Sequence, residues 1–279
     1  LCAAQFMLIV DVVVLNVALP SIRSGLNIAD AQLPLAGVAY TLTFGSLLIV
    51  AGRAGDLLGR RRIFVVGLAV FTAASVTTGS AHESWQLFGS RALQGVGAAM
   101  ISPTTLALLT TIFPEGPERN RALGLWAAMG SGGAIAGQLL AGVITDVFGW
   151  RWIFFLNAPI GIAALLLAYQ FVPESRSEDR PRLDVGGAAL LAAGVAALSL
   201  VLSRVSEHGI DAWFTLGATT AVVLLAAFVG LERRQPSPLV RFSLLRLRGV
   251  RTGNTVLALL AGATGGALFF CTLYLQLVL

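Results

Sequence analysis

The sequence contains no lysine and few charged residues of either sign. All 19 basic residues are arginine, and charged residues make up 12% of the 279-residue chain, whereas hydrophobic residues make up 56%. A soluble domain carries roughly 25% charged residues, so this chain has too little polar surface to cover itself in water. The shortage of charge excludes an ordinary soluble globular protein and predicts a chain that crosses a membrane several times.

The sequence also lacks the residue patterns of nucleic-acid-binding proteins, metal sites, disulfide frameworks and enzymes. The arginines are spread over short loops and form no basic face with interleaved aromatic residues, which argues against nucleic-acid binding. The two cysteines, Cys2 and Cys271, have neither metal-ligand spacing nor a disulfide framework. No nucleophile with a base and no pair of carboxylates indicates an enzyme. We therefore expect no catalytic residues, no metal and no resident cofactor.

Long apolar runs fill most of the chain. We predict about nine transmembrane helices, each near the roughly 20 residues that cross the hydrocarbon. They cover approximately residues 1–22, 35–52, 63–80, 86–110, 123–146, 152–172, 185–204, 213–231 and 254–278. The runs are too long for barrel strands and do not alternate apolar with polar residues. The predicted fold class is therefore all-α, a polytopic membrane helical bundle.

The arginines between the spans predict the orientation in the membrane. Loops after the first, third, fifth and seventh spans contain only Arg23, Arg151 and Arg204. Loops after the second, fourth, sixth and eighth spans contain fifteen arginines, namely Arg53, Arg60, Arg61, Arg62, Arg119, Arg121, Arg176, Arg180, Arg182, Arg233, Arg234, Arg241, Arg246, Arg248 and Arg251. Basic residues favour the cytoplasmic side. We therefore expect a multi-pass protein of the cell membrane with a cytoplasmic N-terminus.

The loop between the second and third spans reads GRAGDLLGRRRIF from Gly52 to Phe64. Fixing the topology would by itself explain Arg60 and Arg61. It does not explain Asp56 or the flanking Gly52 and Gly59. Small residues allow another helix end to approach closely, and a carboxylate there can pair with arginine or with a helix N-terminus. We expect this loop to control conformational gating.

The pattern of this loop resembles the signature loop of the major facilitator superfamily, at the same place between spans 2 and 3. Four more stretches agree: LIVDVVVLNVALP in span 1, LFGSRALQGVGAAM in span 4, the glycines of span 5, and WRWIFFLNAPIG opening span 6. Together they resemble the fourteen-span drug:proton antiporter branch. In that branch, Gln138 stands where the span 5 motif usually has proline.

The resemblance implies an architecture. Residues 1–172 would form a six-helix bundle of two inverted three-helix repeats, and 173–253 a cytoplasmic loop, two extra spans and a second loop. Residues 254–279 would be the first helix of a second bundle, with further spans after Leu279. Helix packing is expected at Gly95, Gly133, Gly137 and Gly142.

The resemblance also implies a function. We expect a monomeric secondary transporter in the lipid bilayer that exports drugs or amphipathic small molecules by alternating access, driven by protons and without a cofactor. An importer or uniporter of the same fold is one alternative. A truncated fragment that does not transport is another.

Asp11 and Arg91 are the two charged residues that lie well inside the predicted spans. Each is costly in lipid, by at least about 2.5–3.5 kcal/mol. One alternative is that these charges are merely tolerated, with the side chain of Arg91 reaching the outer surface. The other is that they form a proton-coupling pair. Burial disfavours the charged carboxylate and a nearby arginine favours it, so Asp11 is a plausible proton carrier. The resemblance points to Arg91 in the same role.

Three uncharged polar residues accompany this pair, namely Asn16, Gln94 and Gln138. At about 1.5 Å per residue, Arg91 lies level with Asn16, and Asp11 lies level with Gln138. We expect two polar layers that face one water-filled cavity.

Overall fold

The computed structural model describes residues 1–279 except 30–31, 177–183, 209–210, 236–237, 240–241 and 279. It divides the chain into two units, Leu1–Leu239 and Val240–Leu279. The first contains α1 (Cys2–Leu26), α2 (Pro34–Leu58), α3 (Arg60–Gly79), α4 (Ser84–Ile112), α5 (Pro117–Phe148), α6 (Arg151–Phe155), α7 (Asn157–Phe171), α8 (Val185–His208) and α9 (Ala212–Glu232). The second contains the 3-10 helix η2 (Phe242–Arg246) and α10 (Arg248–Val278).

The predicted all-α fold is confirmed over the described residues, which include no strand. Eight helical segments among them are long and apolar enough to cross a membrane, with α6 and α7 counted as one segment, Arg151–Phe171. These segments coincide with the eight predicted spans between residues 1 and 231. Helix α10 covers the ninth predicted span, and its side chains after residue 263 lie outside the described part.

The sixth span is interrupted at Leu156, which the sequence did not predict. Pro159 lies in the first turn of α7, where a missing backbone N–H is tolerated. A continuous helix would need that N–H to donate to the carbonyl oxygen of Phe155, four residues earlier. The break therefore places Asn157 at the start of α7.

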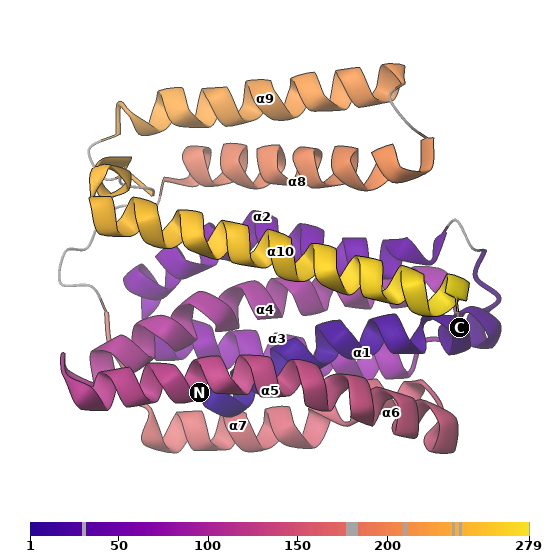
Figure 1. Cartoon of the computed structure of the whole chain (residues 1–279). Coiled ribbons are helices and arrows are strands. Elements are labelled where there is room, and N and C mark those ends of the chain that lie inside the picture. Colours follow the sequence, from indigo (N-terminus) through magenta and orange to yellow (C-terminus); the bar gives the residue numbers. More distant parts are fainter. Residues whose placement is uncertain (30–31, 177–183, 209–210, 236–237, 240–241, 279) are drawn as a thin grey trace. The chain divides into compact units, whose positions relative to one another are not determined.

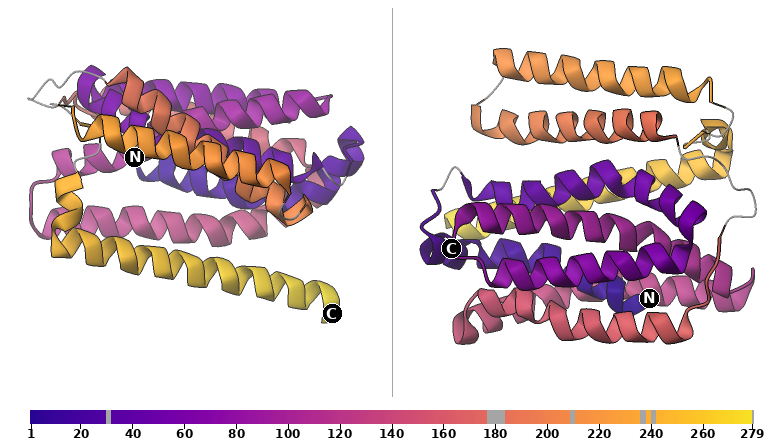
Figure 2. Two further views of the ribbon diagram at one scale, coloured as in Figure 1. Left: turned by 90° about the horizontal axis from the view of Figure 1, so that it is seen from above. Right: turned by 180° about the vertical axis from the view of Figure 1, so that it is seen from behind.

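Within the first unit, α1 packs on α5 and α2 packs on α4, while α3 lies against α4 and α7 (Figure 1). The first two pairings are reciprocal, because each joins the first helix of one three-helix set to the second helix of the other. Helices α8 and α9 form a pair beside this bundle, with α8 against α2 and α9 outermost (Figure 2).

Glycines allow the close helix contacts. A Cβ at Gly95 would overlap the Thr43 hydroxyl and the Tyr40 carbonyl of α2. A Cβ at Gly133 would lie 3.2 Å from the Phe6 carbonyl oxygen of α1, and one at Gly137 would lie 3.3 Å from the Cα of Val10.

Gly142 makes no such contact with the described residues. A Cβ there would have no neighbour within 4 Å among the described residues. The buried stripe of α5 consists of Gly133, Gly137 and Ala141. This spacing of four residues keeps one face towards α1, and Gly142 lies about 100° further round the helix.

Candidate proton-coupling site and gating loop

An ion pair joins α1 to α4 inside the bundle. Nη1 of Arg91 donates to Oδ2 of Asp11 at 2.6 Å. Each residue is only 1% exposed. Two charges removed from water in this way must neutralise each other, because the desolvation of either alone costs several kcal/mol.

The guanidinium of Arg91 is held by other helices as well. Its Nε donates to the carbonyl oxygen of Ala36 in α2 at 3.4 Å. Its Cζ lies 4.6 Å from the ring centroid of Tyr40 and 5.9 Å from that of Phe154. Aromatic faces attract cations, so apolar rings of α2 and α6 stabilise the arginine where water would otherwise do so.

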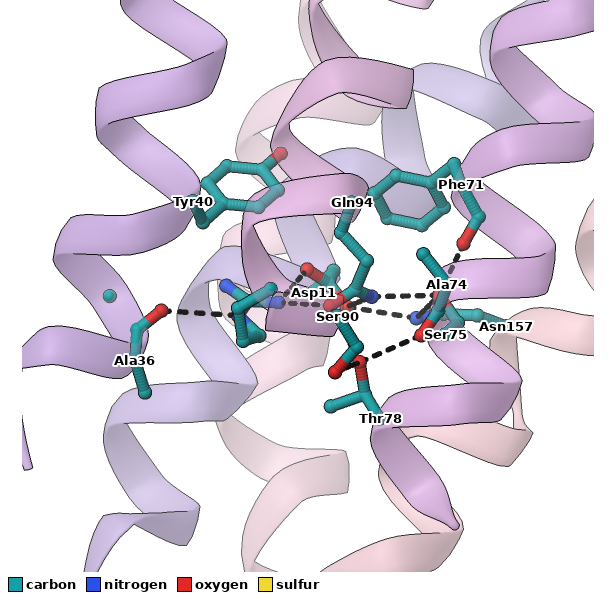
Figure 3. Close-up of polar contacts among 12 residues, drawn as sticks. Asp11, Ala36, Tyr40, Phe71, Ala74, Ser75, Thr78, Ser90, Gln94 and Asn157 are labelled. Carbon is teal, nitrogen blue, oxygen red and sulfur yellow. Dashed lines mark hydrogen bonds and ion pairs between the residues drawn. The ribbon is translucent and has the colours of Figure 1, made fainter. Parts of the chain in front are cut away.

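Neutral polar side chains complete the surroundings of Asp11 (Figure 3). Its Oδ1 accepts hydrogen bonds from Nε2 of Gln94 and from Nδ2 of Asn157, both at 3.0 Å. The hydroxyl oxygen of Ser75 accepts from the same two amides, at 2.7 Å from Gln94 and 3.4 Å from Asn157. Helices α1, α4 and α7 thus meet at one carboxylate, and α3 contacts the two amides that bind it.

This arrangement fits one protonation state of Asp11. Among the described residues, the hydrogen-bond partners of the carboxylate are all donors, from Arg91, Gln94 and Asn157. A protonated carboxyl would bring one more donor and would no longer balance the charge of Arg91. An ionised carboxylate thus matches both the three donors and the charge of Arg91.

The structure brings together Asp11, Arg91 and Gln94 but not the other two residues of the expected cavity. Asn16 and Gln138 are exposed. Rotation about the helix places these two side chains on exposed faces, away from the ion pair. Their expected place beside a water-filled cavity stays a prediction. Asn16 is five residues, or about 140° of rotation, beyond Asp11. The side chain of Arg91 does not extend to the outer surface. It points to Asp11 and is long enough to cover the difference in depth between the two residues.

Asn157, Ser75 and Thr78 were missed by the sequence analysis. The Thr78 hydroxyl lies within hydrogen-bond distance of the Ala74 carbonyl oxygen at 2.7 Å, the Ser90 hydroxyl at 2.9 Å and Oε1 of Gln94 at 3.2 Å, and its single proton serves one of them at a time. Serine and threonine are common in membrane helices, so a single sequence does not distinguish these from others. Asn157 lies two residues before Pro159 in an apolar span, and a polar residue so close to a proline was the available signal.

A second set of charges lies where α2 meets α3, with Gly59 alone between the two helices and the expected loop largely helical. Oδ1 of Asp56 accepts from Nε and Nη2 of Arg60, at 3.0 and 2.8 Å, as expected for a carboxylate that pairs with arginine. Nη1 of Arg60 donates to the hydroxyl of Thr111 in α4 at 2.6 Å. The loop is thereby fastened to the end of α4.

Glu174, which the sequence analysis did not single out, holds the other side of this loop. Its Oε1 accepts from the backbone N–H of Arg61 at 3.1 Å, at the N-terminus of α3. Its Oε2 lies 3.9 Å from Nε of Arg61 and 3.7 Å from Nε of Arg62. A carboxylate is favourable at this end of a helix. Because Glu174 follows α7, it ties the sixth span to the start of the third.

Gly52 and Gly59 allow the close approaches in this loop. A Cβ at Gly52 would lie 3.3 Å from the Cβ of Pro103 in α4. Gly59 has a φ of 119°, and a Cβ there would lie 2.7 Å from Oε1 of Glu174. Only glycine satisfies both the dihedral angle and the space at position 59.

Fold and site together define a polytopic α-helical membrane protein with a buried ion pair in its bundle. The chain belongs to the Major Facilitator Superfamily, whose family model matches residues 1–279.

Several curated proteins resemble the chain over nearly all of its length. It is 41% identical to the cephamycin export protein CmcT of Amycolatopsis lactamdurans, covering 100% of this chain and 58% of that protein. It is 38% identical to the puromycin resistance protein pur8 of Streptomyces alboniger, covering 99% and 55%. It is 35% identical to the multidrug resistance protein Stp of Mycobacterium tuberculosis, covering 97% and 51%. The chain thus spans little more than half the length of these relatives.

Solved structures agree on the fold. A bacterial homologue of the lysosomal transporter Spinster, inward-facing and unoccupied, matches with a TM-score of 0.54 at 20% identity over 82% of this chain and 60% of that one. The POT family transporter PepTSo matches with a TM-score of 0.58 at 14% identity over 82% and 51%.

We predict that Gly59→Ala lowers the thermal stability of the purified protein by several degrees, because it adds both backbone strain, of about 1–3 kcal/mol, and a clash with Glu174. Gly116→Ala is the matched control, since Gly116 has a φ of 147° and open space around its missing Cβ. In a Glu174→Ala background, Gly59→Ala should cause a smaller further loss of thermal stability than it causes in the parent, because the backbone strain remains and the clash is gone. Equal melting temperatures for Gly59→Ala and Gly116→Ala would contradict the role given to Glu174.

Proposed function

We propose that this chain is part of a secondary active transporter that exports drugs or other amphipathic small molecules in exchange for protons, by alternating access. The observation that carries the proposal is the fully buried ion pair of Asp11 and Arg91. Intramembrane ionisable residues are expensive and mark ion or proton pathways. No bond of the substrate is made or broken in this cycle.

The ion pair explains how a proton could drive a change of conformation. In the described state the carboxylate of Asp11 is paired with Arg91. A proton on Asp11 would remove that attraction and leave a buried arginine without a counterion, which favours a different packing of α1 against α4. A ligand shifts a conformational equilibrium by its differential affinity for the two states. The proton has such a preference, because it binds the unpaired state.

The substrate class rests on the relatives. Two of them are named for cephamycin export and puromycin resistance, and a third for multidrug resistance. A shared sequence over nearly the whole of this chain supports antibiotics or similar amphipathic molecules as its substrates too. The chain would act as a monomer in the bilayer, with the substrate and protons as its partners.

The proposed location is the cell membrane, with the N-terminus in the cytoplasm. This orientation follows from the arginine bias of the loops. It places the loop of Asp56 and Arg60, with Glu174, on the cytoplasmic side, where their contacts would hold α2, α3, α4 and the end of α7 together. Opening of that side would require these contacts to change, which gives the loop its gating role.

The orientation predicts a labelling pattern. With Cys2 and Cys271 replaced by serine, a cysteine at Ser84 should react with an impermeant maleimide only from outside. A cysteine at Glu115, whose side chain is 91% exposed, should react only after the membrane is opened. The two residues flank α4, so each is the control for the other. The reverse pattern would overturn the orientation.

The proton-carrier role of Asp11 predicts the behaviour of two variants of the protein expressed from its complete reading frame. In proteoliposomes with an imposed pH gradient, Asp11→Asn should still bind puromycin but lose at least about tenfold in proton-driven transport, because asparagine has no proton to exchange. Asp11→Glu should retain part of the activity. Both puromycin uptake and the internal pH are measured.

The same assay separates the alternatives. An exporter that exchanges drug for protons should dissipate the imposed pH gradient when puromycin is added, whereas a uniporter should not, and a symporter would move both solutes the same way. Asn16→Ala is a matched control, because Asn16 lies on α1 but away from the ion pair. Proton-driven export by Asp11→Asn at the parental rate would show that Asp11 carries no proton.

A further inference from the structure

Asn157 is a buried polar residue that has no role in the proposed exchange of a proton between Asp11 and its surroundings. It is 3% exposed and begins α7, directly after the break in the sixth span. Its Nδ2 donates to Oδ1 of Asp11 at 3.0 Å across 146 positions of sequence. A neutral amide is therefore placed against the oxygen of the carboxylate that Arg91 does not occupy.

Ser75 fixes the direction of this amide. The Ser75 hydroxyl donates to the carbonyl oxygen of Phe71 at 2.9 Å, so its oxygen is left as an acceptor. That oxygen accepts from both Gln94 and Asn157. Each amide thus uses one N–H on Ser75 and presents the other to Asp11 (Figure 3).

Gln94 cannot easily turn round either. Its Oε1 accepts from Nη1 of Arg91 at 2.9 Å. A flipped amide would turn its N–H groups towards the guanidinium, which has only donors. The two amides are therefore both held with donors facing the carboxylate.

We propose that Asn157 is a positioning residue that, oriented by Ser75, stabilises the ionised form of Asp11 and so sets the pH at which the site exchanges its proton. This inference rests on the proposed function and deepens it. Hydrogen bonds to a charged acceptor are about twice as strong as those between neutral groups. Loss of the amide therefore weakens the carboxylate state more than the protonated state.

The charged and titratable groups around Asp11 are few among the described residues. Helix α4 contributes Arg91, and α2 contributes Tyr40, whose ring lies against the guanidinium. Helices α3 and α7 contribute the uncharged Ser75 and Asn157. Helix α5 contributes the glycine face that packs on Val10. Asn157 can thus be changed without altering any charge in the site.

The test uses the protein from its complete reading frame, reconstituted in lipid and titrated by infrared spectroscopy. The C=O absorption of a protonated buried carboxyl is assigned to Asp11 by its loss in Asp11→Asn. In Asn157→Leu, which keeps the branched shape but is larger and has no donor, this band should appear at a pH about one unit higher than in the parent, a roughly tenfold change in proton affinity. The pH profile of puromycin-driven proton movement should shift by the same amount.

Gln170→Leu is the matched control, since it removes an exposed amide from the same helix. Should Asn157→Leu not fold, Ser75→Ala tests the same point, because its loss frees both amides. The shift should then be smaller and in the same direction. Thr77→Val is its control, since the Thr77 hydroxyl donates to the carbonyl oxygen of Ala74 within its own helix, α3, and to no other described residue.

The outcomes separate this inference from the proposed function. An unchanged midpoint in both Asn157→Leu and Ser75→Ala, or a shift to lower pH, overturns the role of Asn157. A shifted band in a protein whose parent moves no protons on addition of puromycin would sustain the role of Asn157 and overturn proton-coupled export.

Discussion

The attraction between Asp11 and Arg91 is the interaction on which the arrangement of the bundle depends. Both charges are out of reach of water, at 1% exposure. In such a place the loss of one partner costs about 3–5 kcal/mol, because it leaves an uncompensated buried charge. Spans α1 and α4 are therefore fixed in rotation and in height relative to each other, and the neighbouring helices arrange their polar atoms around the pair.

Each neighbouring helix contributes a group that the pair needs. Helix α2 provides the carbonyl of Ala36 and the ring of Tyr40, α3 provides Ser75, and α7 provides Asn157. Helix α7 also leads into Glu174, which holds the N-terminus of α3. Helix α7 has 15 residues and is about 22 Å long. It contacts the buried Asp11 at its start, and Glu174 after its end binds the gating loop.

The sequence predicted the spans and the charged residues well, because their signals are strong and local. Apolar runs of about 20 residues and a loop bias in arginine need no tertiary information. Asp11, Arg91 and Asp56 stood out because a charge in or beside a membrane span is costly. Gln94 was found from its place one turn from Arg91.

Relations that depend on rotation about a helix axis or on distant contacts were not predictable in the same way. Asn16 and Gln138 lie near the right depth but on other faces, and Gly142 lies one residue from the stripe that packs on α1. Glu174 and Asn157 act through partners more than 100 positions away in sequence. Their roles depend on which helices become neighbours, and that is decided by packing.

Proton release on drug binding measures the central claim directly. If Asp11 carries the exchanged proton, then drug and proton must each weaken the binding of the other. Addition of puromycin to the purified protein in weak buffer should release roughly one proton per molecule from the protonated parent, and none from Asp11→Asn at equal puromycin occupancy. Equal proton release by the two proteins, or no release by a parent that binds puromycin, would contradict the account.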